Sequence, residues 1–161
     1  MDLRTKSMAA AVLATAATAV ALPALTQAQS SEQTITAREK VRSVTFVHQK
    51  RTTKGQRLAT GDRVLTRQAI FDAAGKPSGT LFTDCANVGA PAAVFKATLQ
   101  CTTTYRFANG QIVAAGVLNL GGKPSIPIVS GTGAYRGVRG VTQTGPAAKG
   151  FDSVDVLRFT N

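Results

Sequence analysis

The sequence contains no tryptophan, one histidine and only two cysteines among its 161 residues. A Ser-His-Asp site on a Gly-x-Ser-x-Gly elbow would need a matching segment beside that histidine, and none is present. A protein metal site needs several good ligands within reach of one another, which one histidine and two cysteines do not supply. The composition therefore argues against a serine hydrolase and against a metal centre.

Acidic residues are also scarce, because eight Asp and Glu oppose 19 Lys and Arg and leave a formal net charge of +11. The basic excess is concentrated between Arg38 and Arg67, where only Glu39 and Asp62 are acidic. Aromatic residues are few and do not alternate with the basic ones as base-stacking platforms would, so nucleic acid is a poor fit. Two interpretations stay open: a solubilising charge, or weak attraction to an anionic cell-surface polymer.

The N-terminus has the pattern of a secretory signal peptide. Arg4 and Lys6 precede an apolar run from Met8 to Leu22, and small residues follow at Thr26 and Ala28. The alternative is a membrane anchor, but the run is shorter than the roughly 20 apolar residues that span a bilayer. We therefore expect a secreted protein without a stable membrane span, divided into a cleaved signal helix (1–28), a flexible arm (29–42) and a β-barrel domain (43–161).

Eight strand-like segments follow, separated by Gly/Pro turns, with no amphipathic helix among them. In the first of them, Val44, Phe46 and His48 share one face at a period of two residues. Several segments are apolar on both faces, as when the outside of a sheet is also covered. This pattern predicts an all-β fold, an eight-stranded antiparallel closed barrel that can hold one small ligand. The segments are 43–50, 61–71, 80–88, 94–107, 111–120, a strand from 126, 138–143 and 151–160.

The third and fourth segments read as an antiparallel hairpin in which facing residues have numbers of constant sum. If Cys85 faces Cys101, then Thr83 faces Thr103, which is a plausible cross-strand pair. Directly opposed residues can approach closely enough for a disulfide. We therefore expect a Cys85–Cys101 bridge; the competing interpretation is a reduced Cys85 in an apolar interior.

Glycines are concentrated in Ile126–Gly140, with the sequence IPIVSGTGAYRGVRG, at a density too high for a helix. In a sheet such glycines mark bulges, bends or close backbone approach. The part from Ile128 onward resembles the G-T-G-x-[FY]-x-x-[AV]-R-G signature of dirigent proteins and allene oxide cyclases. It is most similar to the bacterial secreted branch, the allene oxide cyclase barrel-like domains.

Further matches extend this resemblance over roughly Val44 to Thr160. It implies an eight-stranded antiparallel barrel, usually a homotrimer, with an elongated apolar cavity and with no metal or organic cofactor. Known members steer a reactive intermediate: cyclases close an unstable epoxide, and dirigents direct the coupling of radicals. The matching segments are Gly61-Asp62, Phe71-Asp-Ala-Ala-Gly75, Gly79 to Cys85, Phe107 to Gly110 and Val113 to Gly116.

Four residues are candidates for chemistry inside such a barrel: His48, Asp84, Tyr105 and Arg139. His48 takes the place of the first-strand histidine common in plant dirigents and could move protons near neutral pH, and Arg139 matches the signature arginine. Tyr105 could hydrogen-bond the polar end of a ligand, and Asp84 could act as an acid if it faces the lumen. The structural alternatives are packing for His48 and Tyr105, a brace for Arg139 and a solvated outward carboxylate for Asp84.

The resemblance implies a barrel that binds an apolar or aromatic small molecule and directs its cyclisation or coupling by holding one folded geometry. Allene oxide cyclases also carry an interior glutamate. Glu32 and Glu39 both fall in the expected arm, so no counterpart is predicted. The alternatives are a non-catalytic carrier with the same barrel, and a surface-associated module that binds anionic polymer through the basic first half.

The disulfide gives the first test. The mass of the secreted protein should rise by two hydrogens on reduction, and thiol reagents should label it only after reduction. Two free thiols in the native, unreduced protein would refute the bridge.

Overall fold

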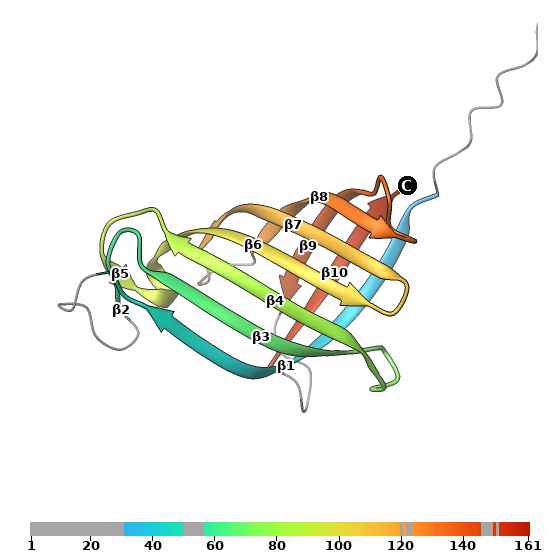
Figure 1. Cartoon of the computed structure of the whole chain (residues 1–161), viewed down its shortest axis with the longest axis horizontal. Coiled ribbons are helices and arrows are strands. Elements are labelled where there is room, and N and C mark those ends of the chain that lie inside the picture. Colours follow the sequence, from blue (N-terminus) through green and yellow to red (C-terminus); the bar gives the residue numbers. More distant parts are fainter. Residues whose placement is uncertain (1–30, 50–56, 120, 122–123, 146–149, 151) are drawn as a thin grey trace, which may run out of the picture.

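The computed structural model describes residues 31–49, 57–119, 121, 124–145, 150 and 152–161. Its strands are β1 (Gln33–Val47), β2 (Arg57–Leu58), β3 (Arg63–Phe71), β4 (Pro77–Asn87), β5 (Ala92–Ala93), β6 (Thr98–Phe107), β7 (Gly110–Asn119), β8 (Ser125–Gly133), β9 (Arg139–Gly145) and β10 (Ser153–Thr160), with a 3₁₀ helix η1 at Val94–Lys96. Eight of them close into an antiparallel barrel in the order β1-β10-β9-β8-β7-β6-β4-β3 (Figure 1). This confirms the fold expected from the sequence.

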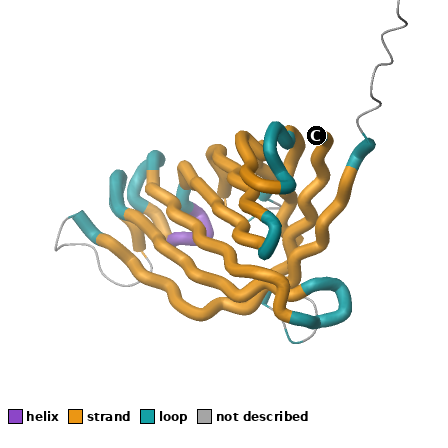
Figure 2. The backbone as a smooth tube through the Cα atoms, turned by 45° about the vertical axis from the view of Figure 1, so that its right-hand side comes forward, coloured by secondary structure: helices purple, strands orange, loops and turns teal. Residues whose placement is uncertain are grey.

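The short strands β2 and β5 form a separate two-stranded sheet at the end of the barrel where β4 finishes (Figure 1). The helix η1 follows β5 directly (purple in Figure 2). Leu58, Val94 and Ala97 from this region pack with the inward residues Val64 and Leu99 in one apolar cluster. We call this end of the barrel the open end, because the cavity described below reaches the surface here.

The glycine-rich segment fills the opposite end, which we call the closed end. The turn between β8 and β9 places Tyr135 against Phe107 and Phe159, with ring centroids 5.6 and 6.0 Å apart. Val138 is fully buried beside them. Gly137 adopts a φ of +83°, a conformation that residues with a side chain rarely adopt. The signature segment is therefore the bend that plugs one end of the barrel.

The first strand begins earlier than the sequence suggested. We expected a flexible arm over 29–42, but β1 starts at Gln33 and pairs with β10 from Gln33 to Glu39. The physical reason is a bulge between Val41 and Ser43, where the extra residue Arg42 shifts the register against β3. A bulge reverses the alternation of faces, so no single period-two pattern runs through the strand.

The expected strand at 94–107 is also divided, because Val94–Lys96 form η1 and the barrel strand β6 begins only at Thr98. Ala93 and Ala97, on either side of η1, have extended backbone conformations. The predicted signal helix lies outside the described residues.

The predicted hairpin register is confirmed. Cys85 faces Cys101 and Thr83 faces Thr103 across β4 and β6. The two cysteines form a disulfide, and their Cα atoms are 4.1 Å apart.

A Cβ at Gly140 should destabilise the barrel by about 1–3 kcal/mol, as overpacking does. An alanine there would place Cβ 2.0 Å from the carbonyl oxygen of Arg158 and 2.6 Å from Cα of Phe159. Both are backbone atoms of β10 and cannot rotate away. Gly145→Ala on the same strand is the matched control, since its nearest atom, Val154 O, lies 3.6 Å away. Urea denaturation of both variants measures the difference, and equal midpoints would contradict this close approach.

Candidate functional site

The barrel encloses a cavity of about 330 Å³, within the usual size range of small-molecule sites. Leu81, Leu99, Leu118 and Ile126 give it apolar walls. Phe95 of η1 also lines it while 62% of its surface is exposed, so Phe95 stands where the cavity meets solvent. A ligand can therefore enter from the open end.

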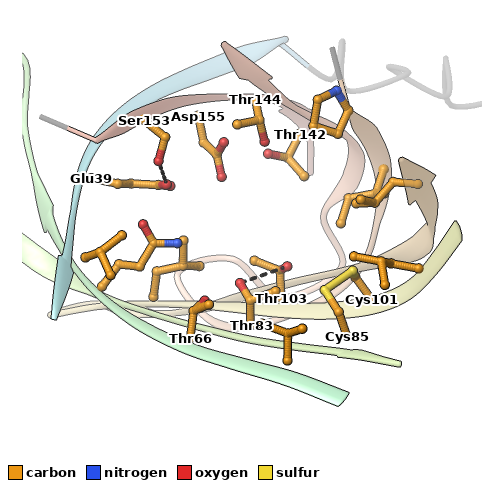
Figure 3. A pocket seen from close by; sticks show the side chains of 18 of the residues that line it. Glu39, Thr66, Thr83, Cys85, Cys101, Thr103, Thr142, Thr144, Ser153 and Asp155 are labelled. Atoms are coloured by element: carbon orange, nitrogen blue, oxygen red, sulfur yellow. Dashed lines mark hydrogen bonds between the residues drawn. A yellow bond between two sulfur atoms is a disulfide. The ribbon is translucent and has the colours of Figure 1, made fainter. Parts of the chain in front are cut away.

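Polar side chains line the cavity on two facing walls (Figure 3). One wall comes from β3, β4 and β6 and carries Thr66, Thr83, Thr103 and the disulfide, with Thr83 and Thr103 hydroxyls 3.3 Å apart. The opposite wall comes from β1, β10 and β9, and its labelled members are Glu39, Thr142, Thr144, Ser153 and Asp155. The second wall is the acidic one.

Glu39 is the buried acid of this wall. Its exposed fraction is 1%, and its Oε2 accepts a 2.6 Å hydrogen bond from Ser153 Oγ. Burial, followed by repulsion from Asp155, raises the pKa of Glu39 to about 9, although the Ser153 hydrogen bond lowers it. Glu39 therefore holds its proton at neutral pH and can donate it.

Asp155 lies beside Glu39 and is 4% exposed. The Tyr105 hydroxyl donates a hydrogen bond to Asp155 Oδ2 and lies 2.9 Å from Thr142 Oγ1, which can donate to it in turn. Burial, together with the charge of Asp155, holds the pKa of Tyr105 well above its usual range. Tyr105 thus stays a neutral donor, and the cavity contains a connected chain of Thr142, Tyr105 and Asp155.

Four residues of the cavity lining have a buried side-chain oxygen with no hydrogen bond to another described residue, apart from the contact between the carboxyl groups of Glu39 and Asp155. These oxygens are Glu39 Oε1, Thr66 Oγ1, Gln68 Oε1 and Asp155 Oδ1. A buried acceptor without a donor costs free energy, so native interiors rarely leave one unpaired. All four oxygens are therefore available to hydrogen-bond a molecule in the cavity.

Of the four candidates from the sequence, the structure brings only Tyr105 into the cavity. Asp84 lies on the outer face of β4, where Arg63 donates to both of its carboxylate oxygens, at 3.0 Å from Nε. This is the outward, solvated alternative for Asp84. Arg139 is exposed at the start of β9 and donates from its guanidinium to the carbonyl of Val138 at 2.8 Å. This hydrogen bond agrees with the structural alternative, in which Arg139 braces the bend of the chain, and it is not a contact with the cavity.

His48 lies just beyond the end of β1 and does not line the cavity. Its Nδ1 is 2.8 Å from Oδ2 of the buried Asp62. Asp62 also accepts backbone hydrogen bonds from Gln49 and Ala59. The hydrogen bond from His48 is the main reason that the pKa of Asp62 falls to about 2. The pair ties β1 to the turn before β3, so its role in this structure is to hold that turn.

The fold and the site geometry agree with a comparison to known families. A family model described as the allene oxide cyclase barrel like domain matches residues 42–154, more than half of the chain. The chain belongs to this family. No curated protein matches the sequence.

Solved structures share the barrel of this allene oxide cyclase barrel-like protein at low sequence identity. A pyocyanin demethylase has a TM-score of 0.66 at 20% identity, over 80% of this chain and 100% of the other. The Diels-Alderase AbmU from Streptomyces koyangensis has a TM-score of 0.58 at 14% identity, over 84% and 70%. The pterocarpan synthase dirigent protein PsPTS1 has a TM-score of 0.55 at 16% identity, over 81% and 91%. At this identity the likeness is one of fold.

Sequence reasoning missed both interior acids. It placed Glu39 in a flexible arm and found no interior glutamate, whereas β1 carries Glu39 into the lumen of this allene oxide cyclase barrel-like domain. Asp155 alternates with Val154 and Val156 in the last strand, and a charged residue on the face shared with Leu157 was the available signal. A lone charge on an apolar strand face points either to solvent or to a functional interior.

In the described part of the chain, no helix is long and apolar enough to cross a membrane. The same residues contain no group of three or more His, Cys, Asp or Glu side chains that could hold a metal ion.

The raised pKa of Glu39 predicts a pH-dependent stability. An acid whose folded pKa exceeds its unfolded value stabilises the fold at low pH, and this contribution is lost as pH rises from about 4.5 to about 9. Glu39→Gln should remove a slope of at most about 1.4 kcal/mol per pH unit and so be more stable than the native protein at pH 8.

Urea denaturation between pH 5 and pH 8 measures this slope. The depressed pKa of Asp62 acts below this window, because its contribution is lost only as pH falls from 3.8 towards 2. Glu32→Gln is the control, since Glu32 is exposed. Parallel curves for the native protein and Glu39→Gln would show that Glu39 does not retain a proton.

Proposed function

We propose that this allene oxide cyclase barrel-like protein binds a largely apolar small molecule in its lumen and directs the cyclisation or coupling of that molecule. The observation that carries the proposal is the convergence of the buried polar side chains Glu39, Asp155 and Tyr105 in a cavity that also has apolar walls of leucine and isoleucine. A few converging polar groups in an apolar pocket are the usual character of a ligand site.

The first contribution of the cavity would be geometric. A closed end plugged by Tyr135 and Val138 and walls of buried leucines leave a flexible ligand few conformations. When binding already holds the reacting atoms close together in one geometry, less entropy is lost on the way to the transition state, and the activation barrier is lower. Burial of the reacting centre also keeps water from intercepting an unstable intermediate.

The second contribution would come from the acids. Protonated Glu39 can donate to an oxygen or nitrogen of the ligand, and the Tyr105 hydroxyl holds Asp155 in place from the other side. Two carboxyl groups in one buried site do not readily ionise together, because their negative charges repel. One of the two then stays protonated and can act as an acid, while the other can act as a base. The pair could therefore donate a proton at one ligand atom and accept one at another.

The names of two structural neighbours, a Diels-Alderase and a pterocarpan synthase dirigent protein, support this proposal at the level of the fold. The disulfide supports a secreted location, because such bonds persist mainly in oxidising compartments. The expected attraction to an anionic polymer and the expected trimer stay predictions. Basic side chains do gather outside the barrel, where Arg67 and Arg106 both lie against the ring of Phe82.

A cavity-filling variant tests the binding site. Thr103→Phe places a ring in the lumen. Thr102 is the next residue on β6 and its side chain is exposed, so the ring of Thr102→Phe points to solvent. Titration with the fluorescent neutral probe N-phenyl-1-naphthylamine should show that Thr103→Phe lowers the affinity for the probe by at least about tenfold, as expected for a blocked pocket. Thr102→Phe should leave this affinity unchanged. Equal binding by both variants would place the probe outside the lumen.

Chemistry is tested with a linear triene that bears a dienophile and undergoes [4+2] cyclisation slowly unaided. The native protein should give an excess of one stereoisomer by chiral chromatography, and Glu39→Gln should lower the rate while Thr102→Phe leaves it unchanged. Tight binding without any change in rate or isomer ratio would identify a carrier.

A further inference from the structure

The charge inside the barrel is opposite to the charge of the whole protein. The chain carries a formal net charge of +11. Three acids, Glu39, Asp152 and Asp155, line the cavity, and the described lining residues include no Lys, Arg or His. The described lining therefore favours positive charge, although the net charge of the whole chain is positive.

No cation of the described cavity lining neutralises these acids. Ser153 donates to Glu39 and Tyr105 donates to Asp155, and both donors are neutral. When the two carboxyl groups share one proton, they retain one negative charge in a site where both residues are at least 96% buried. A buried charge normally has an ionic partner, because leaving it unpaired costs several kcal/mol.

The unpartnered oxygens point to the same conclusion by a separate route. The buried oxygens Glu39 Oε1, Gln68 Oε1 and Asp155 Oδ1 accept no hydrogen bond from a protonated nitrogen or hydroxyl of the described residues, and all three residues line this cavity. Even if the Glu39 proton is shared with Asp155, the Gln68 oxygen and the pair's negative charge still lack a partner. Among the lining residues that the structure describes, hydrogen-bond donors and positive charges are therefore too few to match these groups.

Three arginines on the outer face of the barrel do not supply this positive charge to the cavity. Arg63 is paired with Asp84 on the outer face, and Arg67 and Arg106 lie against Phe82 there. Salt screens exposed charges beyond about 8 Å at physiological ionic strength, so these arginines do little to repel a cation that is already inside. The charge preference of the cavity is set by its lining.

We propose that the ligand of this cavity is an organic cation with an apolar body, such as a protonated amine or an N-alkylated aromatic ring, whose positive charge lies against Asp155 and Glu39. This inference rests on the proposed function and deepens it by naming the ligand class. The apolar walls would hold the body of the cation, and the exposed Phe95 ring at the opening could attract it on entry.

The test uses three aromatic probes of similar shape and different charge at pH 7.5. They are 10-methylacridinium (cation), 9-methylacridine (neutral) and acridine-9-carboxylate (anion). Fluorescence titration of the native protein should give affinities in the order cation, neutral, anion. The cation should bind about tenfold or more tightly than the neutral probe, the ratio expected for one charge-assisted contact. Equal or reversed affinities would overturn the proposal.

Variants then locate the charge. The double variant Glu39→Gln/Asp155→Asn should bind the cation and the neutral probe equally, and its binding of the neutral probe shows that the cavity is intact. Asp84→Asn, the same change of charge outside the barrel, should keep the native preference. A cation preference that survives in the double variant would refute the assignment to these acids, and an unfolded double variant leaves the native probe series decisive.

The outcomes also separate this inference from the proposed function. If the neutral probe binds in the lumen at least as tightly as the cation, the cation preference fails while the small-molecule site stands. If none of the three probes binds and Thr103→Phe has no effect on N-phenyl-1-naphthylamine, both fail.

Discussion

The pairing of β1 with two partners is the constraint on which the rest of the structure depends. β1 forms ladders with β10 through Glu39 and with β3 on its other edge, and these two ladders close the sheet into a barrel. Closure gives the chain an inside, and alternation along each strand then decides which side chains face it. The bulge at Arg42 lets one strand serve both ladders while it turns Glu39 inward before the bulge and Phe46 inward after it.

Much of the fold could be predicted from the sequence because local signals agree with the final pairing. The β4–β6 register followed from the spacing of two cysteines, and the Thr83–Thr103 pair confirmed it. The glycines of Ile126–Gly140 correctly indicated a bend. What could not be predicted is the start of β1, because the register shift after Val41 interrupts the alternation on which a strand assignment relies.

The candidate site was harder to predict for a related reason. Inward and outward positions differ by one residue, so Asp84 and Cys85 lie on opposite faces although they are neighbours in sequence. Tyr105 was a candidate because its hydroxyl can hydrogen-bond a ligand, and the β4–β6 register places it opposite the buried Leu81. Glu39 and Asp155 meet only when β1 and β10 pair across the closure, and their contact joins residues from the two ends of the domain. No local sequence pattern indicates a contact between residues so far apart in the chain.

The disulfide has a consequence for how the protein is made. Cys85 and Cys101 are both part of the cavity lining (Figure 3), so their oxidation state sets the chemistry of the binding surface as well as the stability of the hairpin. Material produced in a reducing cytoplasm would face its ligand with two thiols, which react with electrophiles and oxidants. Material exported through an oxidising compartment would present an inert sulfur pair. Two preparations of one sequence would then differ in what they bind covalently.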